Sequence, residues 1–168
     1  MRGVFLVELM VCLLVAAVLL ALGLPGLRSM LRDMQVRVAA QDLVGALAWT
    51  RAEAVRGGAA ITLRFRPRTE CISPPARRHC GWEVFRDLDG NTKRDASEKL
   101  LAVHALPVQV DLPDVSSSAI QYLADGAVST KGVHIVIGPT GAATGDPATR
   151  IVCSQFGGRV RIAMGEHC

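Results

Sequence analysis

The stretch Met1-Arg2-Gly3-Val4-Phe5-Leu6-Val7-Glu8-Leu9-Met10 opens the chain and leads into a long apolar run. No charged residue lies between Leu9 and Leu27. As an α-helix, these nineteen residues would be roughly 28 Å long, which is enough to cross the hydrocarbon core of a bilayer. The run therefore predicts a transmembrane helix. Glu8 lies at its start, where a lone carboxylate is costly and indicates a partner or a functional role.

The spacing of Gly3 and Glu8, with an apolar residue after the glycine, resembles the prepilin cleavage site of type IV pilins and pseudopilins. Val4 stands where that pattern usually has Phe, and Phe5 follows it. The resemblance implies that a prepilin peptidase cuts after Gly3 and that the new N-terminus at Val4 is methylated. It also implies that Glu8 of one subunit pairs with the Val4 ammonium of a neighbour during filament assembly, because opposite charges attract strongly in a low dielectric. The alternative is a carboxylate that merely snorkels to the membrane surface.

A cleaved secretory signal is the alternative for the N-terminus, with a cleavage site near Ala21-Leu22-Gly23. Two features oppose it: the basic region is reduced to Arg2, and Glu8 interrupts the apolar core. The sequence also stays helical in character beyond Gly23. We therefore favour the pilin-type interpretation.

The charges on either side of the apolar run disagree with the expected orientation. Only Arg2 precedes the run, whereas Arg28, Arg32 and Arg37 follow it. The positive-inside rule alone would place the rest of the chain in the cytoplasm. The cysteines and the family resemblance favour the periplasm, and we follow them: the expected location is the bacterial inner membrane, crossed once.

Four cysteines, Cys71, Cys80, Cys153 and Cys168, lie beyond the predicted membrane anchor. An even number there favours an oxidising compartment and two disulfides, for which three connectivities exist. We expect the nearest-neighbour pairing, Cys71–Cys80 and Cys153–Cys168. Zinc is the alternative because histidines adjoin Cys80 and Cys168, but the spacing lacks the usual paired-ligand pattern.

Composition narrows the class of protein. Of the 168 residues, about 140 remain for a soluble part, a normal size for one domain. The net charge of +4 is mild and permits an anionic partner without demanding one. No histidine lies in a recognised catalytic signature, and Gly138–Gly145 lacks the Lys-Ser/Thr of a phosphate-binding loop. We expect neither an enzyme nor a cofactor.

The segment from Leu27 to Arg56 reads as an amphipathic helix that Gly57-Gly58 would end. Its apolar positions form two successive stripes. We expect the first to pack on other subunits and the second on the chain's own sheet. The first comprises Leu27, Met30, Leu31, Met34 and Val38, and the second Leu43, Val44, Leu47, Ala48 and Val55.

Beyond the helix, short runs of β-forming residues alternate with turn residues. The predicted strands are Ile61–Phe65, Trp82–Phe85, Lys99–His104, Val108–Leu112, Ala119–Leu123, Val133–Ile137, Arg150–Ser154 and Arg159–Ala163. The fold expected is α+β: a long N-terminal helix, transmembrane in its first half, packed on antiparallel sheets. Residues 1–3 would be the leader, 4–27 the transmembrane half, and 28–168 the globular domain with the amphipathic half of the helix.

Two internal segments narrow the family. Leu47-Ala48-Trp49-Thr50-Arg51-Ala52-Glu53-Ala54-Val55-Arg56-Gly57-Gly58 resembles the end of the long helix in the FimT/GspH group of minor pilins and pseudopilins. Gly81-Trp82-Glu83-Val84-Phe85-Arg86-Asp87-Leu88-Asp89-Gly90-Asn91, followed by Arg94-Asp95 and Glu98, resembles the same group. With the N-terminus, these matches span the chain to about residue 110.

An acidic stretch fits a calcium loop in part. Asp87, Asp89, Asn91, Asp95 and Glu98 fall at positions 1, 3, 5, 9 and 12 of an EF-hand-like frame. Position 6, which needs glycine, is Thr92, and no helices are expected on either side. We favour a polar hairpin turn without a metal, and calcium is the alternative.

Near the C-terminus, Gly158-Arg159-Val160-Arg161 resembles the GRxR motif of DNA-binding FimT-type minor pilins. In a strand, Arg159 and Arg161 would project from one face and could each grip a phosphate. Other arginines that could assist are Arg64 and Arg66 in the first strand and Arg77 and Arg78 in a loop. The sequence shows no obvious aromatic stacking platform, so we expect contacts with the DNA backbone. A solvated basic strand is the alternative.

We therefore expect a minor type IV pilin of the FimT/GspH type that takes part in pilus assembly and in DNA uptake during natural transformation. Its expected partners are other major and minor pilins, the prepilin peptidase, the inner membrane before assembly, and DNA. The nearest alternative is an H-type pseudopilin of a type II secretion system, structural and without DNA binding. A calcium-regulated periplasmic module is more distant.

Overall fold

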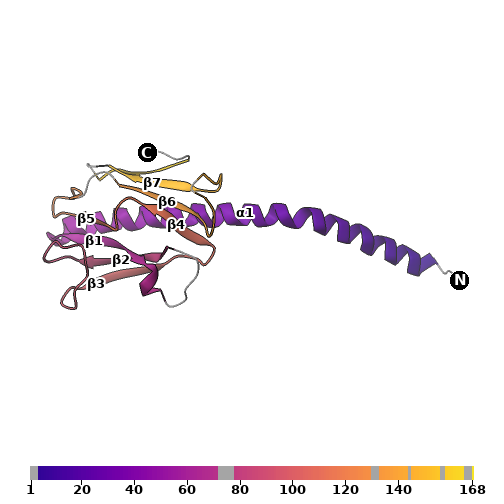
Figure 1. The fold of residues 1–168 in the computed structure, drawn as a ribbon, viewed down its shortest axis with the longest axis horizontal. Helices are drawn as coiled ribbons and strands as arrows, with labels where there is room; N and C mark the ends of the chain where they lie inside the picture. Colours follow the sequence, from indigo (N-terminus) through magenta and orange to yellow (C-terminus); the bar gives the residue numbers. More distant parts are fainter. Residues whose placement is uncertain (1–3, 72–77, 130–132, 144, 156–157, 165–167) are drawn as a thin grey trace.

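The computed structural model describes residues 4–71, 78–129, 133–143, 145–155, 158–164 and 168. A single long helix, α1 (Val4–Gly57), projects from a domain built of two antiparallel sheets (Figure 1). Within the described ranges, α1 is the helix long and apolar enough to cross a membrane. The long helix on antiparallel sheets confirms the predicted fold class.

The strands follow α1 in chain order, with one 3-10 turn, η1 (Arg68–Glu70), after the first. Sheet A has the strand order β3-β2-β1-β5 and sheet B the order β4-β6-β7-β8. Every predicted strand is confirmed to within a few residues. The strands are β1 (Ile61–Pro67), β2 (His79–Arg86), β3 (Leu100–Ala105), β4 (Val110–Val115), β5 (Ala119–Tyr122), β6 (Val133–Pro139), β7 (Arg150–Ser154) and β8 (Val160–Ala163).

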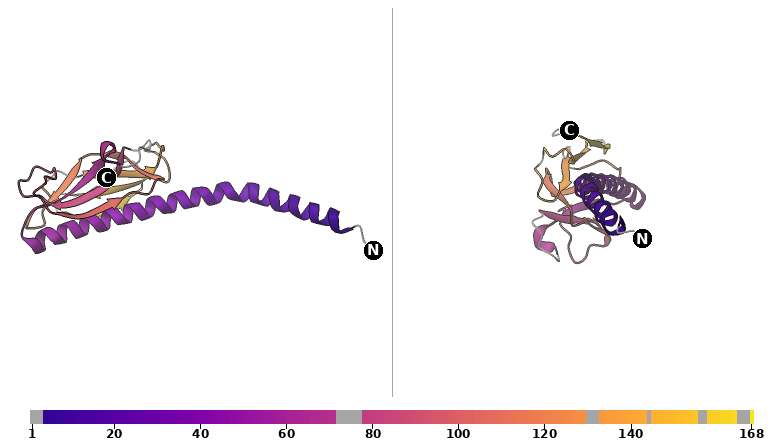
Figure 2. Two further views of the ribbon diagram at one scale, coloured as in Figure 1. Left: turned by 90° about the horizontal axis from the view of Figure 1, so that it is seen from below. Right: turned by 90° about the vertical axis from the view of Figure 1, so that its right-hand side faces the viewer.

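The second half of α1 lies across both sheets, and the first half extends away from them along a gentle curve (Figure 2). The buried face of the helix begins at Val36 and recurs every three or four residues, as an amphipathic helix requires. That face comprises Val36, Ala39, Ala40, Leu43, Leu47, Thr50 and Ala54. It packs on the inner faces of the sheets, where Leu63 and Trp82 of sheet A and Ile135 of sheet B are also buried.

The two predicted apolar stripes on α1 differ in their burial. The five residues of the first stripe are all exposed in the isolated chain, and what covers them stays a prediction. In the second, Leu43 and Leu47 are buried as predicted, but the prediction was wrong for Ala48 and Val55, which are exposed. Thr50 takes part in the buried face instead, because its hydroxyl donates to the backbone oxygen of Ala46 at 2.6 Å and leaves no donor unsatisfied.

Both predicted disulfides are present. Cys71–Cys80 joins the residue after η1 to β2, and Cys153–Cys168 joins β7 to the end of the chain. This pairing excludes the other two connectivities, and it removes the thiolates on which the zinc alternative depended. Cys12 is an exposed free thiol on α1.

Candidate nucleic-acid interface

The C-terminal arginine pair lies at an open edge of sheet B. Strand β8 has β7 as its neighbour on one side and ends the sheet on the other. Arg159 directly precedes β8 and Arg161 lies within it, and both side chains are exposed. Because side chains alternate along a strand, the two arginines share one face.

A tight turn leads into this pair. The backbone NH of Gly158 donates to Gln155 O at 2.8 Å, and the NH of Gln155 donates to Arg159 O at 3.0 Å. Gly158 has a φ of 73°, in the left-handed region that favours glycine. The first residue of the motif is thus a glycine because the chain must turn there before β8 can pair with β7.

The second disulfide braces Arg161. In the β7–β8 register, Arg161 lies opposite Cys153, whose sulfur is bonded to Cys168. Nη2 of Arg161 donates to the backbone oxygen of Cys168. Arg159 has no side-chain hydrogen bond or ion pair within the described ranges, so its guanidinium is available to an external anion.

The arginines of the first strand do not join the C-terminal pair. Arg64 and Arg66 belong to β1 in the interior of sheet A, whereas Arg159 and Arg161 belong to the edge of sheet B. The register places Arg64 directly opposite Glu83 on β2. The predicted cooperation of all these arginines in one DNA-binding surface therefore lacks support from their placement.

Arg64 is neutralised by two carboxylates. Its Nε donates to Glu83 Oε1 at 2.8 Å, and Nη1 and Nη2 donate to the two oxygens of Glu70 at 2.9 and 2.8 Å. Glu83 is only 4% exposed, so its charge requires a cationic partner. The hydrogen bonds with Glu70, and then those with Glu83, raise the pKa of Arg64 above its usual value. Nη2 of Arg66 donates to the backbone oxygen of Glu70 at 2.9 Å.

Within the described ranges, the two loop arginines, Arg77 and Arg78, add no defined contact to the candidate anion-binding surface. Arg78 is exposed, and its backbone NH, not its side chain, bonds to the carboxylate of Asp111. Arg77 lies outside the described residues. The candidate anion-binding pair is therefore Arg159 and Arg161.

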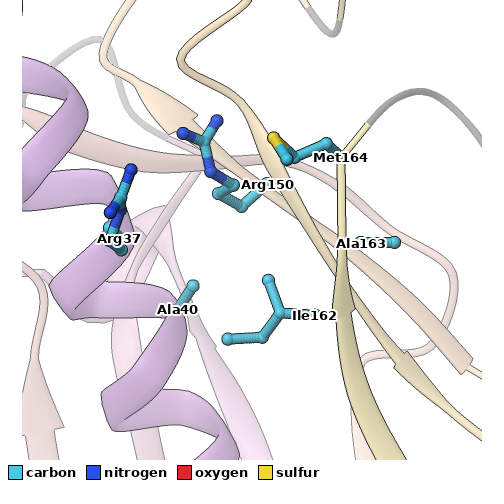
Figure 3. A pocket seen from close by; sticks show the side chains of 6 residues that line it. All are labelled: Arg37, Ala40, Arg150, Ile162, Ala163 and Met164. Atoms are coloured by element: carbon cyan, nitrogen blue, oxygen red, sulfur yellow. The ribbon is translucent and has the colours of Figure 1, made fainter.

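A second group of charges, which the sequence did not suggest, lies where α1 leaves the domain. Arg150 of β7 is nearly buried, and its Nη2 is 2.5 Å from Oδ1 of Asp33, while Nη2 of Arg37 is 3.3 Å from Oδ2 of the same residue. Figure 3 shows the two arginines at one end of a cavity of about 320 Å³, with Ala40 and Ile162 along its apolar wall. Asp33 and Arg150 are 117 positions apart, so no local pattern could pair them.

The acidic stretch forms the loop between β2 and β3, as the hairpin interpretation predicted. Carboxylate oxygens of Asp87, Asp89 and Glu98 come within 4.8 Å of one another. The carboxylate of Asp87 is buried and already accepts four hydrogen bonds. The donors are Thr62 Oγ1 and Gln121 Nε2 at 2.8 Å, Gly90 NH at 2.8 Å and Thr92 NH at 3.0 Å.

The carboxylate of Glu98 is also hydrogen-bonded, in this case by backbone NH groups of the same loop. Glu98 accepts from the NH groups of Leu88 at 2.7 Å and Asp95 at 3.0 Å. Thr92, at the position where an EF-hand has glycine, has a φ of 62°, which is unusual for a β-branched residue. These donors occupy the oxygens that calcium would need, and the cluster reads as a hydrogen-bonded turn.

The N-terminal candidates are only partly described. Gly3 lies outside the described residues, and Val4 is the first residue of α1. Glu8 lies four residues further along α1, and its side chain is exposed in the isolated chain. Its pairing with a neighbouring subunit stays a prediction.

The comparisons with known proteins agree with this architecture. Residues 39–165 match the family described as type II transport protein GspH. The type IV minor pilin FimU of Pseudomonas aeruginosa PAO1 superposes with a TM-score of 0.57 at 17% identity, covering 79% of this chain and 98% of that one. No curated protein matches the chain in sequence.

A pseudopilin is about equally similar. The minor pseudopilin EpsH of the type II secretion system of Vibrio cholerae superposes with a TM-score of 0.56 at 17% identity, covering 82% of this chain and 99% of that one. Another structure of EpsH gives a TM-score of 0.54 at 18% identity, covering 77% and 97%. Identities this low establish a common fold and do not separate a pilus protein from a secretion protein.

Proposed function

Because the chain belongs to the type II transport protein GspH family, we propose that it is a minor pilin of the FimT type whose β8 edge binds DNA. The family places it among the minor pilins and pseudopilins of type IV pili and type II secretion systems. DNA binding and uptake during natural transformation are the parts that we add.

The observation that carries this proposal is the exposed pair Arg159 and Arg161 on one face of an edge strand. Each planar guanidinium can bind two phosphate oxygens at once. Arg159 has no competing partner in the described part of the chain, and the disulfide of Cys153 holds the backbone beside Arg161. Arg159 is thus available to an anion, and Arg161 is held in place beside it.

The contacts should be made with phosphates and not with bases. Trp82 and Tyr122 are buried and cannot stack on a base, and the exposed Trp49 belongs to α1 and not to the β8 edge. Phosphate contacts carry no sequence information directly, so the binding should be weak and independent of sequence. Such binding suits the capture of arbitrary DNA.

The N-terminus supplies the assembly half of the proposal. A prepilin peptidase would cut after Gly3, and the exposed Glu8 would pair with the Val4 ammonium of a neighbouring subunit. The exposed apolar stripe from Leu27 to Val38 would then face other pilins in the filament. Before assembly, α1 would anchor the chain in the inner membrane with the domain in the periplasm.

A salt-titrated binding assay on the soluble domain tests the DNA-binding step. If two phosphates are neutralised, log affinity should fall with log salt with a slope near −2 for duplex DNA. Arg159→Ala with Arg161→Ala should abolish most of the binding and leave the unfolding free energy within about 0.5 kcal/mol, since exposed arginines add little stability. Lysine at both positions should restore part of the binding.

The matched control is Arg68→Ala with Lys93→Ala, which removes two exposed positive charges elsewhere in the domain. This control should bind DNA nearly as well as the wild type. If both double variants lose the same affinity, net charge and not the β8 pair governs binding. If the wild type does not bind at low salt, the DNA-binding proposal is wrong.

The family description itself favours a second candidate, the H-type pseudopilin of a type II secretion system. In that case the protein has a structural role and Arg159 and Arg161 are a solvated basic strand. Deleting the gene and scoring piliation, transformation and protein secretion side by side separates the two functions. Loss of secretion with normal transformation would establish the pseudopilin.

A further inference from the structure

Arg28 and Arg32 lie one turn apart on α1, so their side chains are neighbours on the helix surface. Val36 and Ala40 are completely buried beneath the sheets. Arg28 and Arg32 precede this buried part of the helix by one to three turns and are exposed. Two neighbouring arginines therefore lie on α1 between the apolar run and the part of the helix that the sheets cover.

This pair has no internal counter-charge. Arg37 has Asp33 one turn before it at 3.3 Å, and Arg56 has Glu53 at 2.6 Å. Arg28 and Arg32 have no acidic residue three or four positions away, and no ion pair is found for them in the described ranges. Two like charges four residues apart oppose helix formation slightly, so an external anion would relieve a repulsion that the chain leaves uncompensated.

The pair also lies at a defined height. Arg28 follows Leu27, the last residue of the apolar run, and Arg32 lies about 6 Å further along the helix than Arg28. The polar headgroup layer of a bilayer is about 5–8 Å thick on each side of its hydrocarbon core.

We propose that Arg28 and Arg32 bind the phosphate of an anionic phospholipid headgroup at the membrane surface from which the domain projects. The guanidinium forks would take the phosphate oxygens, and the aliphatic stems would lie along the exposed Leu27 and Leu31 at the edge of the acyl chains. The lipid would hold the subunit upright in the membrane before it enters a filament. This inference rests on α1 crossing the bilayer and is independent of DNA binding.

A lipid fits better than a free anion or an acidic neighbour because the pair starts at the first residue after the apolar run. That position keeps both guanidinium groups in the headgroup layer for as long as the subunit stays in the membrane. Lipid binding also explains why Arg28 and Arg32 lie on the periplasmic side of the span, where the positive-inside rule predicts few basic residues.

The test uses the full chain reconstituted in phosphatidylcholine vesicles with a minor fraction of spin-labelled phosphatidylglycerol or spin-labelled phosphatidylcholine. The wild type should enrich phosphatidylglycerol over phosphatidylcholine at its surface. Arg28→Gln with Arg32→Gln should reduce this preference by about fivefold for each arginine removed, from about 1 kcal/mol per basic residue near an anionic surface. Lysine at both positions should retain most of it.

The matched control is Arg56→Gln with Lys93→Gln, which removes the same charge from the last turn of α1 and from the β2–β3 loop and should keep the wild-type preference. Millimolar inorganic phosphate should not compete if the headgroup at the surface is the ligand. The proposal is wrong if the wild type shows no preference, if the Arg28/Arg32 variant keeps it, or if the control loses as much. Unchanged lipid preference with lost co-assembly in the Arg28/Arg32 variant would instead assign the pair to a neighbouring pilin.

Discussion

The guanidinium of Arg51 packs against the bare backbone of Gly158, so that a Cβ added to Gly158 would lie 3.0 Å from Arg51 Cζ. Gly126 borders the same side chain, with a Cβ position 3.1 Å from Arg51 Nε. Arg51 thus fills the space between the turn after β5 and the turn before β8. The helix segment and the GRxR motif that the sequence offered as separate resemblances are in contact.

Gly158→Ala should therefore destabilise the domain through two effects. Its φ of 73° costs an L-residue about 1–2 kcal/mol, and the new methyl group would displace Arg51. Gly141→Ala is the control, since Gly141 has a φ of 80° with open space around its Cβ position. Chemical denaturation should show the larger loss for Gly158→Ala.

A double-mutant cycle isolates the contact itself. Gly158→Ala should lower the unfolding free energy more than the Gly141→Ala control does. In the Arg51→Ala background this excess should disappear, because the side chain that the new methyl group would displace is absent. Strict additivity of the two single changes would mean that Arg51 does not press on Gly158 in solution.

The two disulfides should be separable by function. Cys153→Ser with Cys168→Ser opens a loop of 15 positions and should lower the unfolding free energy by about 3 kcal/mol in the chain-entropy model. It should also weaken DNA binding, because β8 loses its brace beside Arg161. Cys71→Ser with Cys80→Ser should cost comparable stability in sheet A and leave DNA affinity unchanged. Equal DNA affinity for both variants, measured while both are folded, would remove the bracing role.

The only tyrosine in the sequence, Tyr122, reports on the core. Its hydroxyl is buried beside Ser154 without reaching hydrogen-bond geometry. Burial raises its pKa above the usual value of about 10, with Ser154 and then Arg51 acting in the opposite direction. Below pH 10 the phenol is protonated in both the folded and the unfolded chain, so it adds no pH dependence there.

As the pH rises above 10, the unfolded chain releases this proton first, so the unfolding free energy should fall until the folded pKa is passed. Absorbance near 295 nm should show a single ionisation with a midpoint above 10 in the folded protein. Tyr122→Phe should abolish this part of the alkaline loss and change stability little at neutral pH, because an unbonded hydroxyl is removed. A midpoint at or below 10 would contradict the burial.

Asp87 should matter for folding and not for calcium. Asp87→Ala removes the acceptor of four hydrogen bonds, whose donors belong to Thr62, Gly90, Thr92 and Gln121. The unfolding free energy should therefore fall by about 2–4 kcal/mol. Millimolar calcium should leave the melting temperature of the wild type unchanged. A rise of several degrees with calcium would restore the metal-site interpretation.

Processing of the N-terminus is testable by mass spectrometry of the mature protein. Cleavage after Gly3 predicts a chain that begins with methylated Val4. Gly3→Ala should be processed slowly or normally, and a bulky residue at this position should block processing. A mature chain that begins near Leu24 would show an ordinary signal peptide instead.

Patterns that repeat along the chain predicted the fold well. The spacing of apolar residues located α1 and the strands, and the even set of cysteines allowed the nearest-neighbour pairing that the structure confirms. Ala48 and Val55 were misplaced because hydropathy could not show that Thr50, with its hydroxyl bonded to Ala46, belongs in the core.

Contacts between distant residues were beyond the reach of such patterns. The sequence predicted that Arg64 could assist in binding DNA, but its partner Glu83 comes 19 positions later and is fixed by the register of β1 and β2. Arg150 and Asp33 meet only because β7 packs on α1. The sequence could thus propose Arg159 and Arg161 as a candidate site, which stays a prediction, but it could not show which other arginines are already paired.

The ion pairs of Arg64 have a kinetic consequence. In sheet A the cations Arg64 and Arg94 face the carboxylates of Glu70 and Glu83, so their fields largely cancel beyond the surface. Among the described residues, Arg159 and Arg161 at the edge of sheet B form no ion pair with a carboxylate, so the positive field there is not cancelled in the same way. The field of these arginines would steer a diffusing polyanion toward β8 before any contact forms. Added salt should therefore slow the encounter more than it hastens the departure of a bound strand.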